Sequence, residues 1–573
     1  MTTAPLHLLL AGADDRRPAL AGGLAGDALD RTAAPAGLPE ARQLRDRGRD
    51  PNDLAVQRWA LIVPEGDAGA RREAQVRALV EHRRAEQGCD VRVYRVPAAM
   101  DAADAARWHR EVYLDERVAE AELPFYQLIL GDLDEVPLAL QQVQMIEGAV
   151  GRLAFDDDAG YEAYVDKLLR WERAPAAIPR ARSLFYTAHD GTPATAHAYQ
   201  ALIGPGLAAA RAGRDQGAYA AADIAELGDP GAPPSRDDLL TAAADPAVLL
   251  SVSHGQGPPR RGWSSAAEQR RRQGALSLGA DGAVTGDELA GRRFLPGGVW
   301  LLFACYGAGT PATSVYQPWL ERLRDAGQYG DRLDGVLRGL PRPGERPFIA
   351  GLPRAVLASP DGPLAVIGHV DLAWSYSFEE LDGSAGPRNR VRRFTSLLAC
   401  ALRRDRVGVA FRELVSCAIA ADTELLALYA RQAVLAAAAP DPGFASRLGH
   451  LWMLRHDLLG YLLLGDPAAR LPITPAPVAA AQPLTPQDLF GFAVMPAASV
   501  AVLGVPSPAQ PPAPSPAMSV EALEQAIVRV LAGERADAVA AAHGLDRAEL
   551  DRLAGLYRAA GRAAIARGRG PAT

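Results

Sequence analysis

Cysteines are few in this sequence and long hydrophobic runs are missing, and both shortages exclude classes of protein. The four cysteines, Cys89, Cys305, Cys400 and Cys417, are spread over 573 residues, and none lies in a CxxC pair. So few thiols cannot form a disulfide framework, which fits a reducing compartment. No run reaches about eighteen uncharged apolar residues, so we expect no transmembrane helix. The first residues lack a basic region typical of signal peptides, and we expect a cytoplasmic protein.

Aromatic residues are scarce as well, and neither sign of charge is in large excess. Aromatics make up 6% of the chain, and 61 Lys and Arg stand against 68 Asp and Glu, a net charge of -7. This balance gives no global reason to expect nucleic-acid binding. A hydrophobic content of 49% is ordinary for a globular protein, and the length predicts about two to four domains.

Short apolar runs alternate with helical patterns along most of the chain. These runs lie at 59–64, 90–97, 125–132, 181–190, 247–255, 298–307 and 363–374. Strands that alternate with helices of ten to fifteen residues predict a parallel α/β sheet. The break between the third and fourth runs predicts two α/β subdomains side by side.

The composition divides the chain into five predicted parts. They are a leader (1–58), a first α/β subdomain (59–178), a larger second α/β subdomain (179–475), a Pro/Ala-rich linker (476–518) and a helical tail (519–573). The leader has little periodicity, and we expect it to be mobile or loosely docked. The tail has the pattern of a helix-turn-helix with Gly544 in the turn. Because acidic residues share its second helix, we expect protein interaction there rather than DNA binding.

Two strands of the second series end in residues that could do chemistry together. One ends in His254 and Gly255, and the next ends in Cys305 with glycines close behind. A histidine can take the thiol proton, and the amides of Gly255 and Cys305 can bind an oxyanion. Taken singly, a strand-end cysteine is usually a core residue and a His-Gly pair is usually a turn. The pair on neighbouring strands favours a catalytic role.

The sequence resembles the caspase-like clan of cysteine peptidases, specifically its gingipain-type family. A strand ending in His-Gly, followed about fifty residues later by Ala-Cys-x-Gly, is the signature of that clan. Further segments similar to the family are LILGDLDEVP (128–137), VGRLAFDDDAGYEAYVDKLLRWER (150–173), VIGHVDLAWSYSF (366–378) and LLLGDPAARL (462–471). The resemblance covers about 59 to 475 and implies a caspase/gingipain-like α/β fold.

The resemblance also implies roles for individual residues. His254 would be the base, Cys305 the nucleophile, and Gly255 with Cys305 the oxyanion donors. Asp190 would orient the imidazole, although the same residue could simply form an Asx turn before Gly191. No cofactor and no metal is implied.

Specificity for a basic P1 residue is a further expectation. Trp374 matches the family's pocket aromatic, and Asp371 is the best candidate for the acidic partner of an arginine. The segment after Asp190, TPATAHAY, holds no acidic residue of the kind that arginine-specific relatives carry.

An arginine cluster lies between the two candidate catalytic residues. It comprises Arg260, Arg261, Arg270, Arg271 and Arg272 in a polar stretch, 258–282. Such a run is usually a solvated loop. The functional alternative is an activation loop, cut by the enzyme itself or by an upstream protease.

Three classes of function therefore remain open. The first is an active endopeptidase that acts on protein substrates, away from membranes, in bacterial signalling or anti-phage defence. The second is a non-catalytic scaffold that works through the tail. The third is a regulator that binds DNA through the tail. The presence of both His254 and Cys305, each with glycine close behind it, favours the enzyme.

Overall fold

The computed structural model describes most of the predicted α/β region and few residues beyond position 474. Described are residues 5–29, 50–174, 178–228, 236–327, 329, 331–381, 387–435, 442–474, 539, 540, 542 and 547. The predicted linker and nearly all of the predicted tail lie outside these residues.

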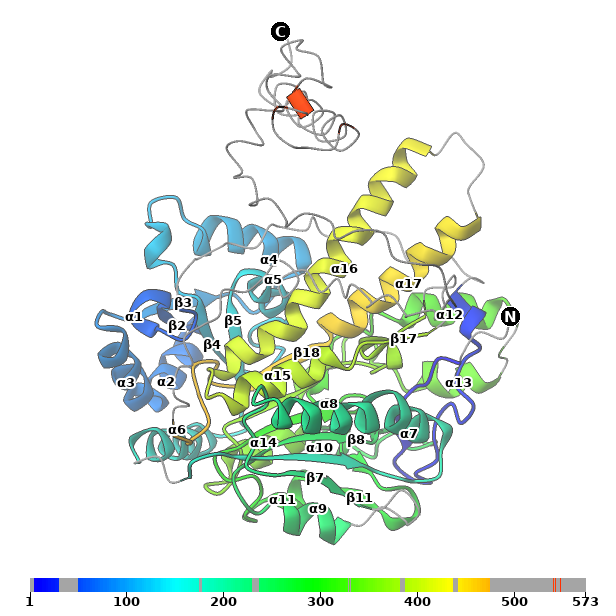
Figure 1. Cartoon of the computed structure of the whole chain (residues 1–573), viewed down its shortest axis with the longest axis horizontal. Helices are drawn as coiled ribbons and strands as arrows, with labels where there is room; N and C mark the ends of the chain where they lie inside the picture. The colour runs from blue at the N-terminus through cyan, green and yellow to red at the C-terminus, as the bar shows by residue number, and fades with distance from the viewer. Residues whose placement is uncertain are drawn as a thin grey trace, which may run out of the picture. The chain divides into compact units, whose positions relative to one another are not determined.

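Ten strands form one continuous sheet at the centre of this region (Figure 1). In order across the sheet they are β3 (Arg92–Val96), β2 (Trp59–Pro64), β4 (Tyr126–Leu130), β5 (Ala149–Leu153), β18 (Tyr461–Gly465), β15 (Ala365–His369), β12 (Val299–Phe303), β8 (Ala247–Val252), β6 (Arg182–Thr187) and β7 (Ile224–Leu227). All neighbouring pairs are parallel except β15 with β18, which is antiparallel. The predicted α/β class with mainly parallel strands is confirmed.

The strands form because their apolar runs can be buried on both faces. Every residue of β2, β4, β5, β8, β12, β15 and β18 is buried. Continuous burial explains why these strands read as unbroken apolar runs rather than as alternating ones. The strand β18 lies between β5 and β15, so both predicted strand series belong to one sheet.

Helices pack around the sheet, and several begin at a side-chain cap. The α-helices among the described residues are α1 (Leu54–Gln57), α2 (Asp67–Gln75), α3 (Arg77–Gln87), α4 (Ala102–Trp108), α5 (Leu138–Glu147), α6 (Asp158–Arg173), α7 (Pro193–Ala198), α8 (Gly204–Asp215), α9 (Arg236–Ala242), α10 (Ala266–Arg272), α11 (Gly286–Leu289), α12 (Gln317–Asp325), α13 (Asp331–Arg338), α14 (Gly351–Ala358), α15 (Arg392–Leu402), α16 (Val407–Leu435) and α17 (Pro442–Leu459). For example, the Asp157 carboxylate accepts the amide of Gly160 at 3.0 Å and caps α6. Helices α16 and α17, yellow in Figure 1, pack against each other. None of the described helices is both long and apolar enough to cross a membrane.

The N-terminal segment, residues 5–29, packs against the rest of the chain. Its leucines Leu6, Leu8, Leu9 and Leu10 are at most 3% exposed. Strand β1 (Leu10–Gly12) pairs in parallel with β9 (His254–Gly257), in a second sheet completed by β10 (Leu276–Ser277) and β11 (Ala283–Val284). In Figure 1 this segment, dark blue, runs along the green part of the chain.

Candidate active site

The sheet brings His254 and Cys305 together. Strands β8 and β12 are neighbours, and Val252 at the end of one pairs with Phe303 at the end of the other. Each candidate residue lies two positions beyond its strand, and both are fully buried. The backbones touch: a Cβ on Gly255 would lie 1.8 Å from the Cys305 carbonyl oxygen. Only glycine fits beside the candidate nucleophile.

The chain turns sharply directly after Cys305. Tyr306 has a φ of 58°, the left-handed conformation that costs a non-glycine residue free energy. Its amide donates to the carbonyl oxygen of Asp371 at 2.9 Å, which holds the turn. Strain of this kind is typical of functional sites, and here it fixes where the Cys305 side chain leaves the sheet.

The thiol of Cys305 is held by one backbone segment. The amide of Ala373 donates to Sγ at 3.2 Å, and Sγ is 3.7 Å from the Ala373 carbonyl oxygen. Burial raises the pKa of Cys305 well above its usual range, although the Ala373 amide opposes that effect. In this arrangement the side chain is a neutral thiol.

The imidazole of His254 faces a threonine and a carboxylate. Its Nε2 is 3.0 Å from Thr192 Oγ1 and 3.7 Å from Asp190 Oδ2. The other carboxylate oxygen, Oδ1 of Asp190, accepts the Thr192 amide and the hydroxyls of Thr192 and Thr195. Asp190 therefore makes the contact of an Asx turn and lies beside the imidazole as well. Burial lowers the pKa of His254 to about 4, and Asp190 acts in the opposite direction.

The two predicted oxyanion donors point at the same atom. The amides of Gly255 and Cys305 both donate to the carbonyl oxygen of Leu9, at 2.8 and 3.4 Å. Two convergent N–H groups are what an oxyanion site requires. In this structure a peptide carbonyl of the chain's own N-terminal segment occupies that position.

The residues predicted to line the P1 pocket are engaged elsewhere. Asp371 Oδ1 accepts the amide of Leu372 at 2.8 Å and Oδ2 that of Val315 at 3.1 Å. Burial raises the pKa of Asp371 to about 7. The Trp374 ring packs edge-on against Tyr316, 5.8 Å between centroids. Neither side chain offers a free group to a basic substrate.

The arginine cluster is more ordered than a loop. Helix α10 starts at a Ser265 cap and includes Arg270, Arg271 and Arg272. Arg270 pairs with Asp156 at 2.8 Å, whereas Arg260 reaches back to Asp15 of the N-terminal segment at 2.7 Å. The role of the cluster as an activation loop stays a prediction.

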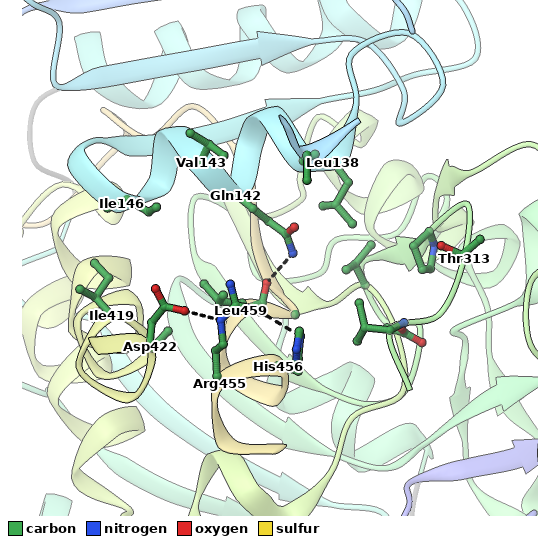
Figure 2. A pocket seen from close by; sticks show the side chains of 18 residues that line it. Leu138, Gln142, Val143, Ile146, Thr313, Ile419, Asp422, Arg455, His456 and Leu459 are labelled. Carbon is green, nitrogen blue, oxygen red and sulfur yellow. Dashed lines mark hydrogen bonds and ion pairs between the residues drawn. The ribbon is translucent and has the colours of Figure 1, made fainter. Parts of the chain in front are cut away.

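A small apolar cavity lies behind the Asp371 segment. It has a volume of about 150 Å³ and is lined by α5, α16 and α17 (Figure 2). Its polar groups are mostly paired: Arg455 binds Asp422, and the Gln142 amide donates to the Leu459 carbonyl oxygen at 3.2 Å. Among its lining residues Asp371 acts on the Cys305 thiol, and its charge raises the pKa of that thiol beside the larger effect of burial.

One group of side chains in the described residues has the spacing of a metal site. The ligand atoms of His82, Glu86 and Glu172 lie within 4.8 Å of one another. Arg83, however, already pairs with both carboxylates, each at 2.7 Å. The cluster is therefore an ion-pair network between helices α3 and α6.

Three residues of the site were not identified from the sequence. They are Leu9, which meets both amides, Thr192, which meets the imidazole, and Asp457. Asp457 accepts the amides of Trp374 and Ser377 at 2.8 and 2.7 Å and so holds the segment beside the thiol. Of these three residues only Leu9 could have been suspected from the sequence, because the run LHLLL (6–10) has the composition of a short buried strand.

Comparisons with known proteins add a likeness of fold at low identity. No protein family and no curated protein matches the sequence. Among solved structures, the chain is similar to the Arg-specific cysteine proteinase gingipain R, with 13% identity, a TM-score of 0.38, and coverage of 73% of this chain and 78% of that one. A structure described only as a protease has 12% identity and a TM-score of 0.41, with coverage of 72% of this chain and 78% of that one. The complex of the pro- and mature domains of Porphyromonas gingivalis RgpB has 14% identity and a TM-score of 0.39, with coverage of 72% of this chain and 79% of that one.

Proposed function

We propose that this chain is a cysteine endopeptidase that uses His254 and Cys305. The observation that carries the proposal is the convergence of the Gly255 and Cys305 amides on one peptide carbonyl oxygen, at 2.8 and 3.4 Å. The Gly255 amide makes this bond within the β1–β9 pairing, and the Cys305 amide joins it from the end of a neighbouring strand, so two N–H groups converge on one position as an oxyanion site requires.

The proposed reaction proceeds from these positions. His254 takes the proton of Cys305, and Sγ forms a bond to the carbonyl carbon of the substrate. The two amides stabilise the resulting oxyanion. The C–N bond then breaks as His254 returns the proton to the leaving amine. Water, deprotonated by His254, hydrolyses the thioester and frees the thiol.

Neighbouring groups would orient the His254 imidazole and keep it neutral. The Thr192 hydroxyl and Asp190 lie on the Nε2 side and fix the ring's orientation. Burial keeps His254 neutral near pH 7, because it lowers the pKa of His254 to about 4. A neutral imidazole is the form that can accept the thiol proton.

The narrower expectations remain proposals. The contacts of Asp371 give no support to a basic P1 residue. A cut at one of the five arginines within 260–272 would be confined to the exposed ones, Arg260, Arg261 and Arg271. A cytoplasmic role in bacterial signalling or anti-phage defence is likewise a proposal.

The decisive experiment is cleavage of a proteome-derived peptide library, with new termini identified by mass spectrometry. We expect new termini with the intact chain or with a variant whose cleft is opened, Leu9→Glu. Cys305→Ala should give none, whereas Cys400→Ala, which removes another buried thiol, should cleave normally. Identical termini from Cys305→Ala and its parent would reject the proposal.

A further inference from the structure

We infer that residues Leu6–Gly12 occupy the substrate cleft in the register of a substrate, and that the enzyme cuts after aliphatic residues. Leu9 takes the place of the residue whose carbonyl is attacked, so it defines the P1 position. This inference rests on the proposed peptidase function but concerns which peptides the cleft binds.

The first argument is the position of the Leu9 backbone. Its carbonyl oxygen accepts both oxyanion amides, those of Gly255 and Cys305. The same backbone lies close enough to influence both catalytic side chains. Beside the larger effect of burial, it raises the pKa of His254 and lowers that of Cys305. The contact that defines the register is the carbonyl oxygen between the two amides.

The second argument is the pairing on either side of Leu9. Before it, Leu8 forms an antiparallel bridge with Trp374. After it, Leu10 pairs in parallel with Gly255, and the pairing continues through Gly12. Addition of an extended peptide to exposed backbone is one of the recurring ways in which proteins hold peptides. The bond presented to Cys305 is the one between Leu9 and Leu10.

The third argument concerns the side chain accepted at P1. Leu9 is only 2% exposed, so its side chain is buried. The carboxyl groups that act on the thiol belong to Asp371 and Asp457, and each already binds two backbone amides. A buried arginine there would have to share carboxyl groups that backbone amides already engage, and an incompletely paired buried charge is costly. An aliphatic side chain has no such cost.

Residues further from the bond hold the segment in the cleft. The ring of His7 lies 4.8 Å from that of His197, which in turn binds Glu379 at 2.7 Å. Asp14 accepts the amide of Arg260 at 2.9 Å. A substrate must therefore displace residues 6–12 before it can reach Cys305.

Alkylation of Cys305 by iodoacetamide in the full chain tests the occupancy without requiring activity. We expect Leu9→Glu to speed labelling at pH 7.5 by at least about tenfold, because the cleft opens and the thiol is exposed. Gly22→Glu is the matched control, since it adds the same carboxylate to an open position of the same segment. Leu9→Asn, uncharged and similar in size, should act in the same direction, and circular dichroism checks that each variant is folded. Equal labelling rates in the parent chain and both Leu9 variants would overturn the occupancy.

Protection from labelling tests the substrate class. In Leu9→Glu, acetyl-His-Leu-Leu-aldehyde should protect Cys305 at a concentration at least about tenfold below its P1-Arg and P1-Asp counterparts. Better protection by the Arg or Asp aldehyde, or none by any of the three, would overturn the inference. Turnover of acetyl-His-Leu-Leu-aminomethylcoumarin is a separate readout. Protection without turnover would reject the peptidase and leave the binding register standing.

Discussion

A Cβ atom on Gly255 would overlap the carbonyl oxygen of Cys305, at 1.8 Å. Gly255→Ala must therefore push the two backbones apart and move an oxyanion donor. We expect kcat/KM to fall by about 100-fold or more in the Leu9→Glu background, because small displacements of catalytic groups have effects of that size. Gly335→Ala, at a position with open space around it, should keep full activity. Normal turnover by Gly255→Ala would argue against the oxyanion site.

Asp190 gives a prediction about the pH dependence of activity. Asp190 raises the pKa of His254 against burial, which lowers it to about 4. Asp190→Asn removes that charge, so the pKa of His254 should fall further. The acid limb of the kcat/KM profile should then move to lower pH, while the plateau drops roughly tenfold as the ring loses its orientation.

Thr192→Val tests the other contact of the imidazole. Loss of the hydroxyl 3.0 Å from Nε2 should lower kcat by about tenfold with little change in KM, because the hydroxyl positions the base rather than the substrate. Thr423→Val, on an exposed face of α16, is the matched control. A change in KM alone would place Thr192 in substrate binding instead.

The reactivity of the thiols in the intact chain is expected to differ from what the sequence implies. A catalytic cysteine normally reacts first, but Cys305 is fully buried and burial raises its pKa. Cys89 and Cys417 are partly exposed. With iodoacetamide at pH 7.5 we expect these two to be labelled before Cys305 in the parent chain. Peptide mass spectrometry over time gives the order, and prior labelling of Cys305 would mean that the cleft is open in solution.

Asp457 predicts a pH dependence of stability. Burial raises its pKa to about 8, against about 3.9 for an unfolded aspartate. Between these values the folded chain binds a proton that the unfolded chain has released, so the free energy of unfolding falls as pH rises from 4 towards 8. Asp457→Asn should remove part of this slope.

Urea unfolding at pH 5, 6.5 and 8 measures the effect. The parent chain should lose more stability over this range than Asp457→Asn, while Asp361→Asn, at a half-exposed position, should behave like the parent. Parallel slopes for the parent and Asp457→Asn would show that Asp457 is ionised in the folded state.

The elements of the sheet were predictable because burial on both faces leaves a strong mark. WALIVP could be recognised as β2, and the runs around Val248 and Leu301 as β8 and β12, since continuous apolar runs ended by Pro or Gly have few alternative explanations. The position of β18 was not predictable. Its partners β5 and β15 are far away in the sequence, and no local pattern encodes which strands become neighbours.

The candidate site was predictable only where one residue type carries the chemistry. His254 and Cys305 stand out because each comes just after a strand and has glycine close behind it. Leu9 does not, because a leucine that contributes only its carbonyl oxygen has no side-chain signature. The engagement of Asp371 could not be foreseen for a similar reason, since its partners are the backbone amides of Leu372 and Val315.

The place of β18 also governs when this fold can be completed during synthesis. Tyr461–Gly465 fills the gap between β5 and β15, so a nascent chain that ends earlier leaves each of these two apolar strands with an unpaired edge. Such edges readily pair with other chains, and the ribosome must add several hundred residues after β5 before the gap can close. The first strand series therefore keeps the edge of β5 unpaired until most of the chain has been made.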